Sequence, residues 1–298
     1  MFDTILAIVA PVAICAAAGF LWVRFRQPYD ADFVGRLVLA VAAPCLTVSA
    51  LGKVRLGTDA LLAMAGYWAV TFVLMLVLGA VLVRLLPAAR RAPLDQRAYV
   101  ASLLFPNVGN MGLPLCLLAF GDEGLALALA WFMVNSVAHF SLGVVAFSGG
   151  RASREFLANP MVWSVFIAVA MVVGDWHLPR WLGNTLELIG GMTIPLMLVA
   201  LGASLANLDV RLFGRALLFS VARVGGGFLA GLVVVLLFGL TGTERGIVLI
   251  QAAMPVAVFN YLFAQRYGRA PQEVAGLVLV STLLSFATLP ALLWYVLR

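Results

Sequence analysis

Two short stretches place prolines and asparagines deep inside runs of apolar residues. The first is F-P-N-V-G-N-M-G-L-P over 105–114, and the second is A-A-M-P-V-A-V-F-N over 252–260. Proline removes a backbone donor and clashes with the preceding helical turn, so each stretch should interrupt a helix. The second half of an interrupted helix begins with unpaired N–H groups and partial positive charge, which together attract an anion.

The residues within these stretches suit a binding site. Asparagine amides can donate to a carboxylate or accept from a cation or water, and glycine lets the backbone approach a ligand closely. We therefore predict a small-molecule site at the two breaks, with six candidate residues: Pro106, Asn107, Gly109, Asn110, Pro255 and Asn260. The alternative is a pair of kinked packing helices whose asparagines bond to neighbouring helices.

The composition places both breaks within a membrane. Hydrophobic residues make up 64% of the 298 residues and charged residues only 11%, whereas soluble domains are about half apolar and a quarter charged. A span needs roughly 20 apolar residues. The sequence therefore predicts an all-α integral membrane protein with ten spanning segments, at about 3–23, 33–51, 60–86, 96–119, 124–147, 157–175, 182–206, 212–239, 244–265 and 272–297.

Basic residues indicate how these segments cross the membrane. Cytoplasmic loops carry an excess of lysine and arginine. One side holds Arg24, Arg26, Arg36, Arg84, Arg90, Arg91, Arg97, Arg151, Arg154, Arg211, Arg215, Arg266 and Arg269, and the other holds only Lys53, Arg55, Arg180, Arg245 and Arg298. The first side is predicted to be cytoplasmic, so both termini lie outside. Arginines spread over short loops do not form a nucleic-acid patch.

Prolines recur at nearly one spacing along the chain. The pairs Pro11 and Pro160, Pro44 and Pro195, and Pro106 and Pro255 are separated by 149, 151 and 149 residues. Five segments per half is an odd number, so the second half must enter the membrane in the opposite orientation. The spacing predicts two inverted five-helix repeats, over 1–147 and 157–298.

Arg223 is a further candidate, because it lies near the middle of the segment 212–239. A charged residue at this depth is costly and is a functional candidate by default. It would either bind a substrate carboxylate through two N–H groups, or cap backbone carbonyls or reach toward the cytoplasmic surface. The glycines at 225–227 would let this segment pack closely on a neighbour.

Polar residues in the fifth and tenth segments complete the candidate site. Asn135 and His139 are four residues apart and share a helix face. His139 would either relay protons or be a packing residue with satisfied hydrogen bonds. Ser285, like Ser281, Thr282 and Thr288, would either line the site or bond to carbonyls of its own helix.

The acidic residues bear on ion coupling. Asp122, Glu123, Asp175, Glu187, Glu244 and Glu273 all stand near segment ends. A sodium site or proton relay commonly uses a carboxylate at mid-depth, so the sequence favours weak coupling or none. Sodium bound by carbonyls and amides, and proton relay by His139, stay open. No spacing of cysteine and histidine suggests zinc, and we expect no metal or cofactor.

At these residues the chain resembles the auxin efflux carrier family. The stretch 105–115, followed by Phe120 and Gly121, resembles the fourth-helix motif, and I-P-L-M-L-V-A-L-G-A-S-L over 194–205 resembles the seventh helix. A-A-M-P-V-A-V-F-N-Y-L-F-A-Q-R-Y-G over 252–268 and V-S-T-L-L-S-F-A-T-L-P over 280–290 resemble the ninth and tenth helices. The likeness covers nearly the whole chain, without the long cytoplasmic loop of plant members.

The resemblance implies a fold similar to that of bile acid–sodium symporters, with ten helices in two inverted repeats. Helices 1, 2, 6 and 7 would form a scaffold that often dimerises, and helices 3–5 and 8–10 a transport domain that moves like an elevator. Broken helices 4 and 9 would cross at the site, which assigns site roles to Pro106, Asn107, Asn110, Pro255 and Asn260. Phe259 stands where many relatives carry the asparagine directly after P-x-A-V, so Asn260 departs from the pattern.

Together these features predict a secondary carrier of small organic anions in the inner membrane of a bacterium. Bacterial members described as malonate transporters suggest the substrate class by resemblance. A sodium- or proton-coupled symporter is the alternative in mechanism, and a channel is a weaker one. No H-E-x-x-H or G-x-S-x-G motif indicates an enzyme. The expected partners are the substrate, the lipid bilayer and a second copy of the chain, with no nucleic acid.

Overall fold

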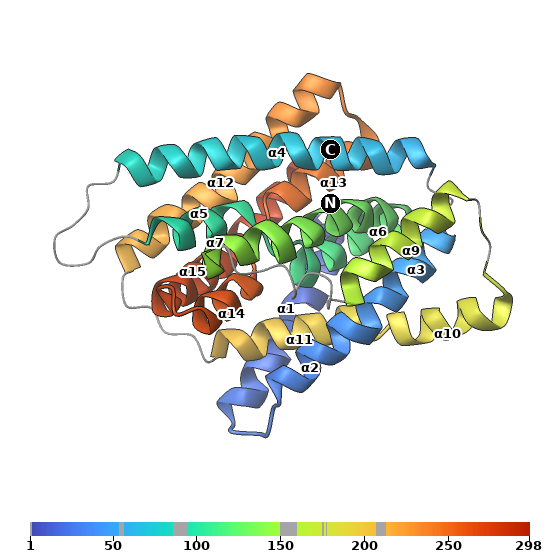
Figure 1. Ribbon diagram of the computed structural model, residues 1–298, viewed down its shortest axis with the longest axis horizontal. Helices are drawn as coiled ribbons and strands as arrows, with labels where there is room; N and C mark the ends of the chain where they lie inside the picture. The colour runs from blue at the N-terminus through green and yellow to red at the C-terminus, as the bar shows by residue number, and fades with distance from the viewer. Residues whose placement is uncertain are drawn as a thin grey trace. The chain divides into compact units, whose positions relative to one another are not determined.

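The computed structural model describes residues 2–53, 57–85, 95–149, 160–174, 176, 178–206 and 213–298 (Figure 1). Its regular elements over these residues are helices, which confirms the predicted all-α class. Seven stretches among the described residues are long and apolar enough to cross a membrane. This pattern is that of an integral membrane protein whose polypeptide crosses the bilayer several times.

Contacts divide the chain into two compact units. The first unit comprises Met1–Ala65, Gly109–Val137 and Ser153–Asn207, and the second comprises Gly66–Val108, Ala138–Ala152 and Leu208–Arg298. Each unit therefore draws on both halves of the sequence. The predicted division into repeats over 1–147 and 157–298, and into scaffold and transport helices, stays a prediction.

The first unit contains helices from the beginning and the middle of the chain. Its elements are α1 (Phe2–Arg24), α2 (Ala31–Leu37), the π-helical turn η1 (Val38–Ala42), α3 (Ala43–Lys53), most of the π-helical turn η2 (Val108–Gly112) and of α6 (Leu113–Ala138), α9 (Pro160–Val173), α10 (Arg180–Gly190) and α11 (Thr193–Ala206).

The second unit contains the remaining helices. Its elements are most of α4 (Thr58–Leu85), α5 (Gln96–Leu104), the π-helical turn η3 (His139–Gly143), α7 (Val144–Ser148), α12 (Phe213–Phe238), α13 (Gly242–Ala252), α14 (Val258–Arg266) and α15 (Pro271–Val296).

The ten predicted segments do not all appear as separate spanning helices in the described ranges. The fourth and fifth continue as one apolar stretch, Val108–Ser148, which bends at Gly121 (φ 65°, ψ −154°), a conformation that glycine alone adopts readily. The ninth is divided into α13 and α14, each too short to span alone. Ten helices and the inverted repeat therefore remain predictions.

Some of the predicted features fall on residues outside the described ranges. The sixth predicted segment begins there, at 157–159, and Asp175 lies there as well. Six of the arginines used to predict the orientation also lie outside the described residues, namely Arg55, Arg90, Arg91, Arg151, Arg154 and Arg211.

Glycines bring α1 and α11 into backbone contact within the first unit. A Cβ atom added at Gly202 on α11 would overlap the carbonyl of Ala16 on α1, and one added at Gly19 on α1 would overlap the carbonyl of Val199 on α11. Small residues at such positions let membrane helices approach closely and gain dispersion contacts. The two glycines therefore hold this helix pair together.

A substitution tests this packing. We expect Gly202→Ala to lower the free energy of unfolding by about 1–3 kcal/mol or more, because the clash is with backbone and forces the helices apart. Gly183→Ala on α10 is the control, since a Cβ atom there meets nothing within 4 Å. Thermal unfolding of the purified variants measures both. Equal stability of the two variants would show that α1 and α11 do not pack this closely.

In the second unit, hydrogen bonds and ion pairs fix the start of α5. Asp95 caps this helix, because its Oδ1 accepts from Ala98 N at 3.2 Å. Its Oδ2 lies 3.3 Å from Nη1 of Arg269, whose Nε also donates to Phe147 O at 2.9 Å. The Tyr99 hydroxyl donates to Glu273 on α15. The helix that leads into the first break is thus anchored to α7 and α15.

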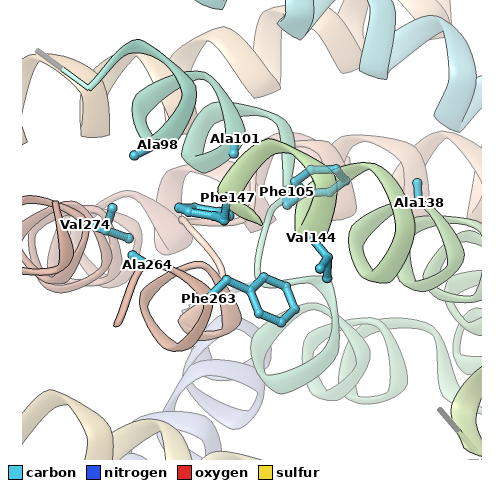
Figure 2. Packing of buried hydrophobic residues seen from close by; sticks show 9 residues of the cluster. All are labelled: Ala98, Ala101, Phe105, Ala138, Val144, Phe147, Phe263, Ala264 and Val274. Atoms are coloured by element: carbon cyan, nitrogen blue, oxygen red, sulfur yellow. The ribbon is translucent and has the colours of Figure 1, made fainter. Parts of the chain in front are cut away.

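A cluster of buried aromatic side chains packs around the first break. Figure 2 shows the rings of Phe105, Phe147 and Phe263 among small side chains of α5, α7 and α15, and all of them are buried. Phe147 and Phe263 lie with ring centroids 6.2 Å apart. Burial of this apolar surface fixes the end of α5 relative to α7 and α14.

Candidate functional site

Both predicted helix breaks are present, and they meet. Helix α5 ends at Leu104 and α13 ends at Ala252, after which the chain runs extended through the two prolines. Pro106 and Val256 form an isolated antiparallel bridge. Asn107 N donates to Pro255 O at 2.7 Å, and Ala257 N donates to Phe105 O at 3.1 Å. The backbone groups released by the two breaks therefore satisfy one another.

Each break is followed by the start of a second half-helix. The π-helical turn η2 begins at Val108 and leads into α6, and α14 begins at Val258. The N-cap residue of α14 is Ala257, which makes no side-chain capping bond in the described structure. A helix start without a side-chain cap keeps N–H groups available for a ligand.

Asn260 joins three elements at the crossing. Its Nδ2 donates to Phe105 O at 3.0 Å, and its Oδ1 lies 2.9 Å from Nε2 of His139. Because Phe105 O can only accept, the amide nitrogen must face it, so His139 carries the proton on Nε2 and donates to Oδ1. Both side chains are buried. The amide of Asn260 is thus bonded on both sides by protein groups.

His139 also packs against the first break through its ring. The imidazole lies parallel to the ring of Phe105, with centroids 4.4 Å apart and an interplanar angle of 7°, and it meets Phe263 edge-on at 5.4 Å. Of the two roles left open by the sequence, this arrangement favours a packing residue with a satisfied hydrogen bond. Asn260 was predicted as a substrate ligand, but its side-chain hydrogen bonds connect the second break to the first.

Two other predicted site residues carry polar atoms that the protein leaves unpaired. Asn107 and Ser285 are buried, yet Asn107 Nδ2 and Ser285 Oγ have no hydrogen-bond partner among the described residues. Buried polar groups are nearly always paired, so each exception calls for an explanation. Both atoms can donate a hydrogen bond.

A series of contacts connects Asn107 to Ser285. Asn107 N is bonded to Pro255 O, and the next residue, Val256, donates from its N to Ser281 Oγ at 3.0 Å. Ser285 follows Ser281 by four residues on α15, so the two hydroxyls share one helix face. Asn107 therefore lies in the crossing, and Ser285 lies one helical turn from a residue that bonds to it.

Arg223 lies fully buried on α12 and faces the ends of the first half-helices. Its Nη1 donates to Leu103 O at the end of α5, and its Nη2 donates to Ala252 O at the end of α13. Its Nε donates to Met254 O at 3.2 Å. Of the roles left open by the sequence, the capping of backbone carbonyls describes this geometry. Three of the five N–H groups of the guanidinium are engaged in this way.

The remaining three predicted site residues belong to the first unit. A Cβ atom added at Gly109 would lie 3.0 Å from Phe132 Cε2 and 3.5 Å from Met197 Cε, so glycine lets η2 lie against α6 and α11. Asn110 is partly exposed on η2, and Asn135 is buried on α6. The other seven lie together in the second unit, namely Pro106, Asn107, His139, Arg223, Pro255, Asn260 and Ser285.

Phe105 is a residue of the crossing that the sequence analysis did not single out. Its carbonyl accepts from both Ala257 N and Asn260 Nδ2, and its ring stacks on His139. The signal was present, because a residue before proline is held in an extended conformation and its carbonyl is freed from the helix. Across the described residues, no group of three or more His, Cys, Asp or Glu side chains could hold a metal ion.

A helical chain with several apolar spans, two of whose helices break and cross within one unit, has the architecture of a multi-pass membrane transporter. Comparison with known proteins gives the same class. The chain belongs to the membrane transport protein family, whose model matches residues 4–156 and 150–295. This match confirms the resemblance to auxin efflux carriers.

Similar proteins include transporters of archaea and bacteria. An uncharacterized transporter of Methanothermobacter thermautotrophicus is 27% identical over 285 residues, which cover 90% of this chain and 89% of the relative. A protein of Rhizobium meliloti named "Putative malonate transporter" is 25% identical over 64% of each chain. An uncharacterized transporter of Methanocaldococcus jannaschii is 24% identical over 63% of this chain and 64% of its own length.

Proposed function

We propose that this transporter is a secondary carrier of small organic anions, such as malonate or related carboxylates, which bind where the two broken helices cross. The observation that carries the proposal is the pair of buried donors, Asn107 Nδ2 and Ser285 Oγ, that lack a partner among the described residues. A carboxylate oxygen accepts bonds from such N–H and O–H groups. The name of the Rhizobium meliloti relative supports the same substrate class.

The backbone adds positive potential at the same place. The second half-helices begin at Val108 and Val258, and each helix start carries about half a positive elementary charge. Asn110 stands on the first turn of one of them, partly exposed. In this proposal Asn107 and Ser285 contact the substrate, and Pro106 and Pro255 shape the backbone around them. Asn110 and Gly109 belong to the first unit, and the site roles predicted for them from the sequence are tested separately.

The proposed mechanism is alternating access of the elevator type, in which a transport domain carries the site past a scaffold. The chain would have ten helices in two inverted repeats, with a scaffold of helices 1, 2, 6 and 7 that forms a homodimer. Helices α1, α3, α9 and α11 lie in the predicted segments 1, 2, 6 and 7. An inverted repeat relates segment 1 to segment 6 and segment 2 to segment 7. The packing of α1 on α11 and of α3 on α9 supports the repeat, because this relation exchanges the two pairs. The proposed location is a bacterial inner membrane, with both termini outside.

A sodium- or proton-coupled symporter and a channel are the competing functions. Coupling would appear as uptake that requires an ion gradient, and a channel as single-channel conductance too fast for a carrier. The absence of mid-depth carboxylates in the sequence favours the uncoupled carrier.

Uptake of radiolabelled malonate into proteoliposomes tests the proposal. We expect saturable uptake in the wild type that is competed by unlabelled dicarboxylates. The same ligand should stabilise the purified protein against thermal unfolding, by about 2.7 kcal/mol at a hundredfold excess over its dissociation constant. If none of the tested mono- and dicarboxylates is taken up, the organic-anion assignment is wrong.

Ser285→Ala separates binding from folding. We expect this variant to lose substrate-induced stabilisation and most of the uptake, and to gain about 1 kcal/mol of stability without ligand, because a buried hydroxyl without a partner is removed. Thr288→Ala on the same helix is the matched control, since Thr288 is exposed and bonds to Leu284 O. Loss of stability in Ser285→Ala with unchanged uptake would mean that Ser285 is only structural.

Asn110→Ala makes a second test of the site. We expect it to reduce uptake while expression and unfolding temperature stay close to those of the wild type, because the partly exposed amide acts on ligand rather than on packing. Expression level and thermal unfolding check the fold, and uptake checks the site. A variant that fails to fold would support the kinked packing helix instead.

A further inference from the structure

We propose that Arg223 is a built-in cation that holds the two broken helices together where other carriers bind a coupling ion, so that substrate binding needs no sodium. The inference rests on the proposed function for its transport arm only, because the role of the arginine in the fold can be measured without any substrate. Arg223 is then a positioning residue, which acts on the substrate through the helices that it joins.

The first step is the set of atoms that Arg223 contacts. Its three hydrogen-bond partners among the described residues are backbone carbonyl oxygens, of Leu103, Ala252 and Met254, and they come from the ends of α5 and α13. The last carbonyls of a helix have no partner within it. Unwound carbonyls and half-helix C-terminal ends are also the ligands that bind sodium in carriers with broken helices. The guanidinium therefore uses the ligands that such an ion would need.

The second step is charge. Each helix C-terminus carries about half a negative elementary charge, and α5 and α13 both end at the arginine. One guanidinium thus matches the two ends together. A second cation placed among the same carbonyls would be repelled at short range in a medium of low dielectric constant. The arginine both removes the need for an ion and opposes its binding.

The third step is the space between α12 and the end of α13. Gly227 follows Arg223 by one helical turn, and a Cβ atom at this position would overlap both Ala252 O and Nη2 of Arg223. The glycine allows α13 to end directly against α12, which brings the carbonyl within reach of the guanidinium. The arginine, the glycine and the helix end form one fitted contact.

The fourth step separates Arg223 from the substrate. Among the donors proposed for the anion, Asn107 and the half-helix starts lie on the other side of the breaks, at η2 and α14, and Ser285 lies on α15. Arg223 bonds instead to the ends of α5 and α13. Arg223 sets the position of both breaks, and the breaks set the positions of Asn107 and the half-helix starts. Loss of the arginine should therefore act on substrate affinity through geometry.

Two arms of one experiment test the inference. In the first, wild-type proteoliposomes take up radiolabelled malonate in sodium buffer and in choline buffer. We expect equal rates, and uptake that requires sodium overturns the proposal. If neither buffer supports uptake, the proposed function fails, and the second arm alone decides this inference.

The second arm measures thermal unfolding of Arg223→Ala without substrate, in millimolar guanidinium chloride and in choline chloride of equal ionic strength. We expect guanidinium to raise the unfolding temperature of this variant, because the free ion fills the space and the bonds left by the side chain. Arg215→Ala, which removes a partly exposed arginine of the same helix, is the control and should show no rise. No rise in Arg223→Ala overturns the proposal.

A pair of variants covers the case in which Arg223→Ala does not fold. Arg223→Lys keeps a positive charge, and Arg223→Met keeps a long stem without the charge. We expect the lysine variant to fold and retain uptake, and the methionine variant to lose about 10-fold or more in uptake, because the carbonyls at the two helix ends lose their donor. A methionine variant equal to wild type, or a lysine variant no better than methionine, overturns the proposal.

Discussion

Replacing Gly227 with alanine should lower the free energy of unfolding by about 3–5 kcal/mol, because it separates a buried charge from its partners. The added methyl group would overlap Ala252 O and Nη2 of Arg223. One of these must move, and either movement separates a buried guanidinium from the carbonyls that satisfy it. Overpacking against backbone adds to this cost.

Gly225→Ala is a matched control for this prediction. The two glycines stand on the same helix two residues apart, but a Cβ atom at Gly225 meets nothing within 4 Å. Alanine is favoured over glycine in a helix by about 0.5–1 kcal/mol, so the control should be neutral or slightly more stable. Chemical or thermal unfolding in detergent measures both variants. If Gly227→Ala is as stable as Gly225→Ala, the contact between Arg223 and α13 is not a determinant of the fold.

Replacing Asn260 with leucine should cost about 2–4 kcal/mol of folding stability. The change leaves the buried Nε2–H of His139 without its acceptor and removes one of the two bonds to Phe105 O. An unsatisfied buried donor costs about 1–3 kcal/mol, and a lost hydrogen bond costs about 1 kcal/mol more. Asn184→Leu is a control, because Asn184 is an exposed residue of α10.

A double-mutant cycle identifies the pair responsible. His139→Phe keeps a ring to stack on Phe105 and removes the donor, so the variant with both changes should be more stable than the sum of the single effects predicts. Additive effects would mean that His139 and Asn260 do not interact. The cycle compares the free energies of unfolding of the wild type, the two single variants and the double variant.

The positions of the two breaks could be predicted from the sequence, because they follow from local chemistry. Pro106 and Pro255 lack the backbone donor that a helix needs at those positions, whatever surrounds them. The resemblance to auxin efflux carriers also implied that the two broken helices would cross. The bridge between Pro106 and Val256 agrees with this prediction.

The partners of the polar side chains could not be predicted in the same way. The bond between His139 and Asn260 joins residues 121 positions apart, and no local pattern determines it. For Arg223, the sequence indicates depth in the membrane but not which carbonyls lie within reach. Asn107 and Asn260 look alike as motif residues, yet one has an unpaired Nδ2 and the other is bonded on both sides.

The three glycines at 225–227 look alike in the sequence but have different surroundings in the structure. The sequence predicted close packing for all three residues together. In the structure a Cβ atom would meet backbone at Gly227, a leucine side chain at Gly226 and nothing within 4 Å at Gly225. The helical period explains the difference, because neighbouring residues point in different directions around the axis.

The carbonyl partners of Arg223 have a consequence for how the chain is made. One partner, Leu103, precedes the arginine by 120 residues, while Ala252 and Met254 follow it by 29 and 31. During synthesis, α12 therefore enters the membrane before two of the three groups that satisfy its charge exist. The arginine must wait at the water interface or against earlier helices until α13 arrives. Final assembly of the crossing therefore has to follow the synthesis of α13.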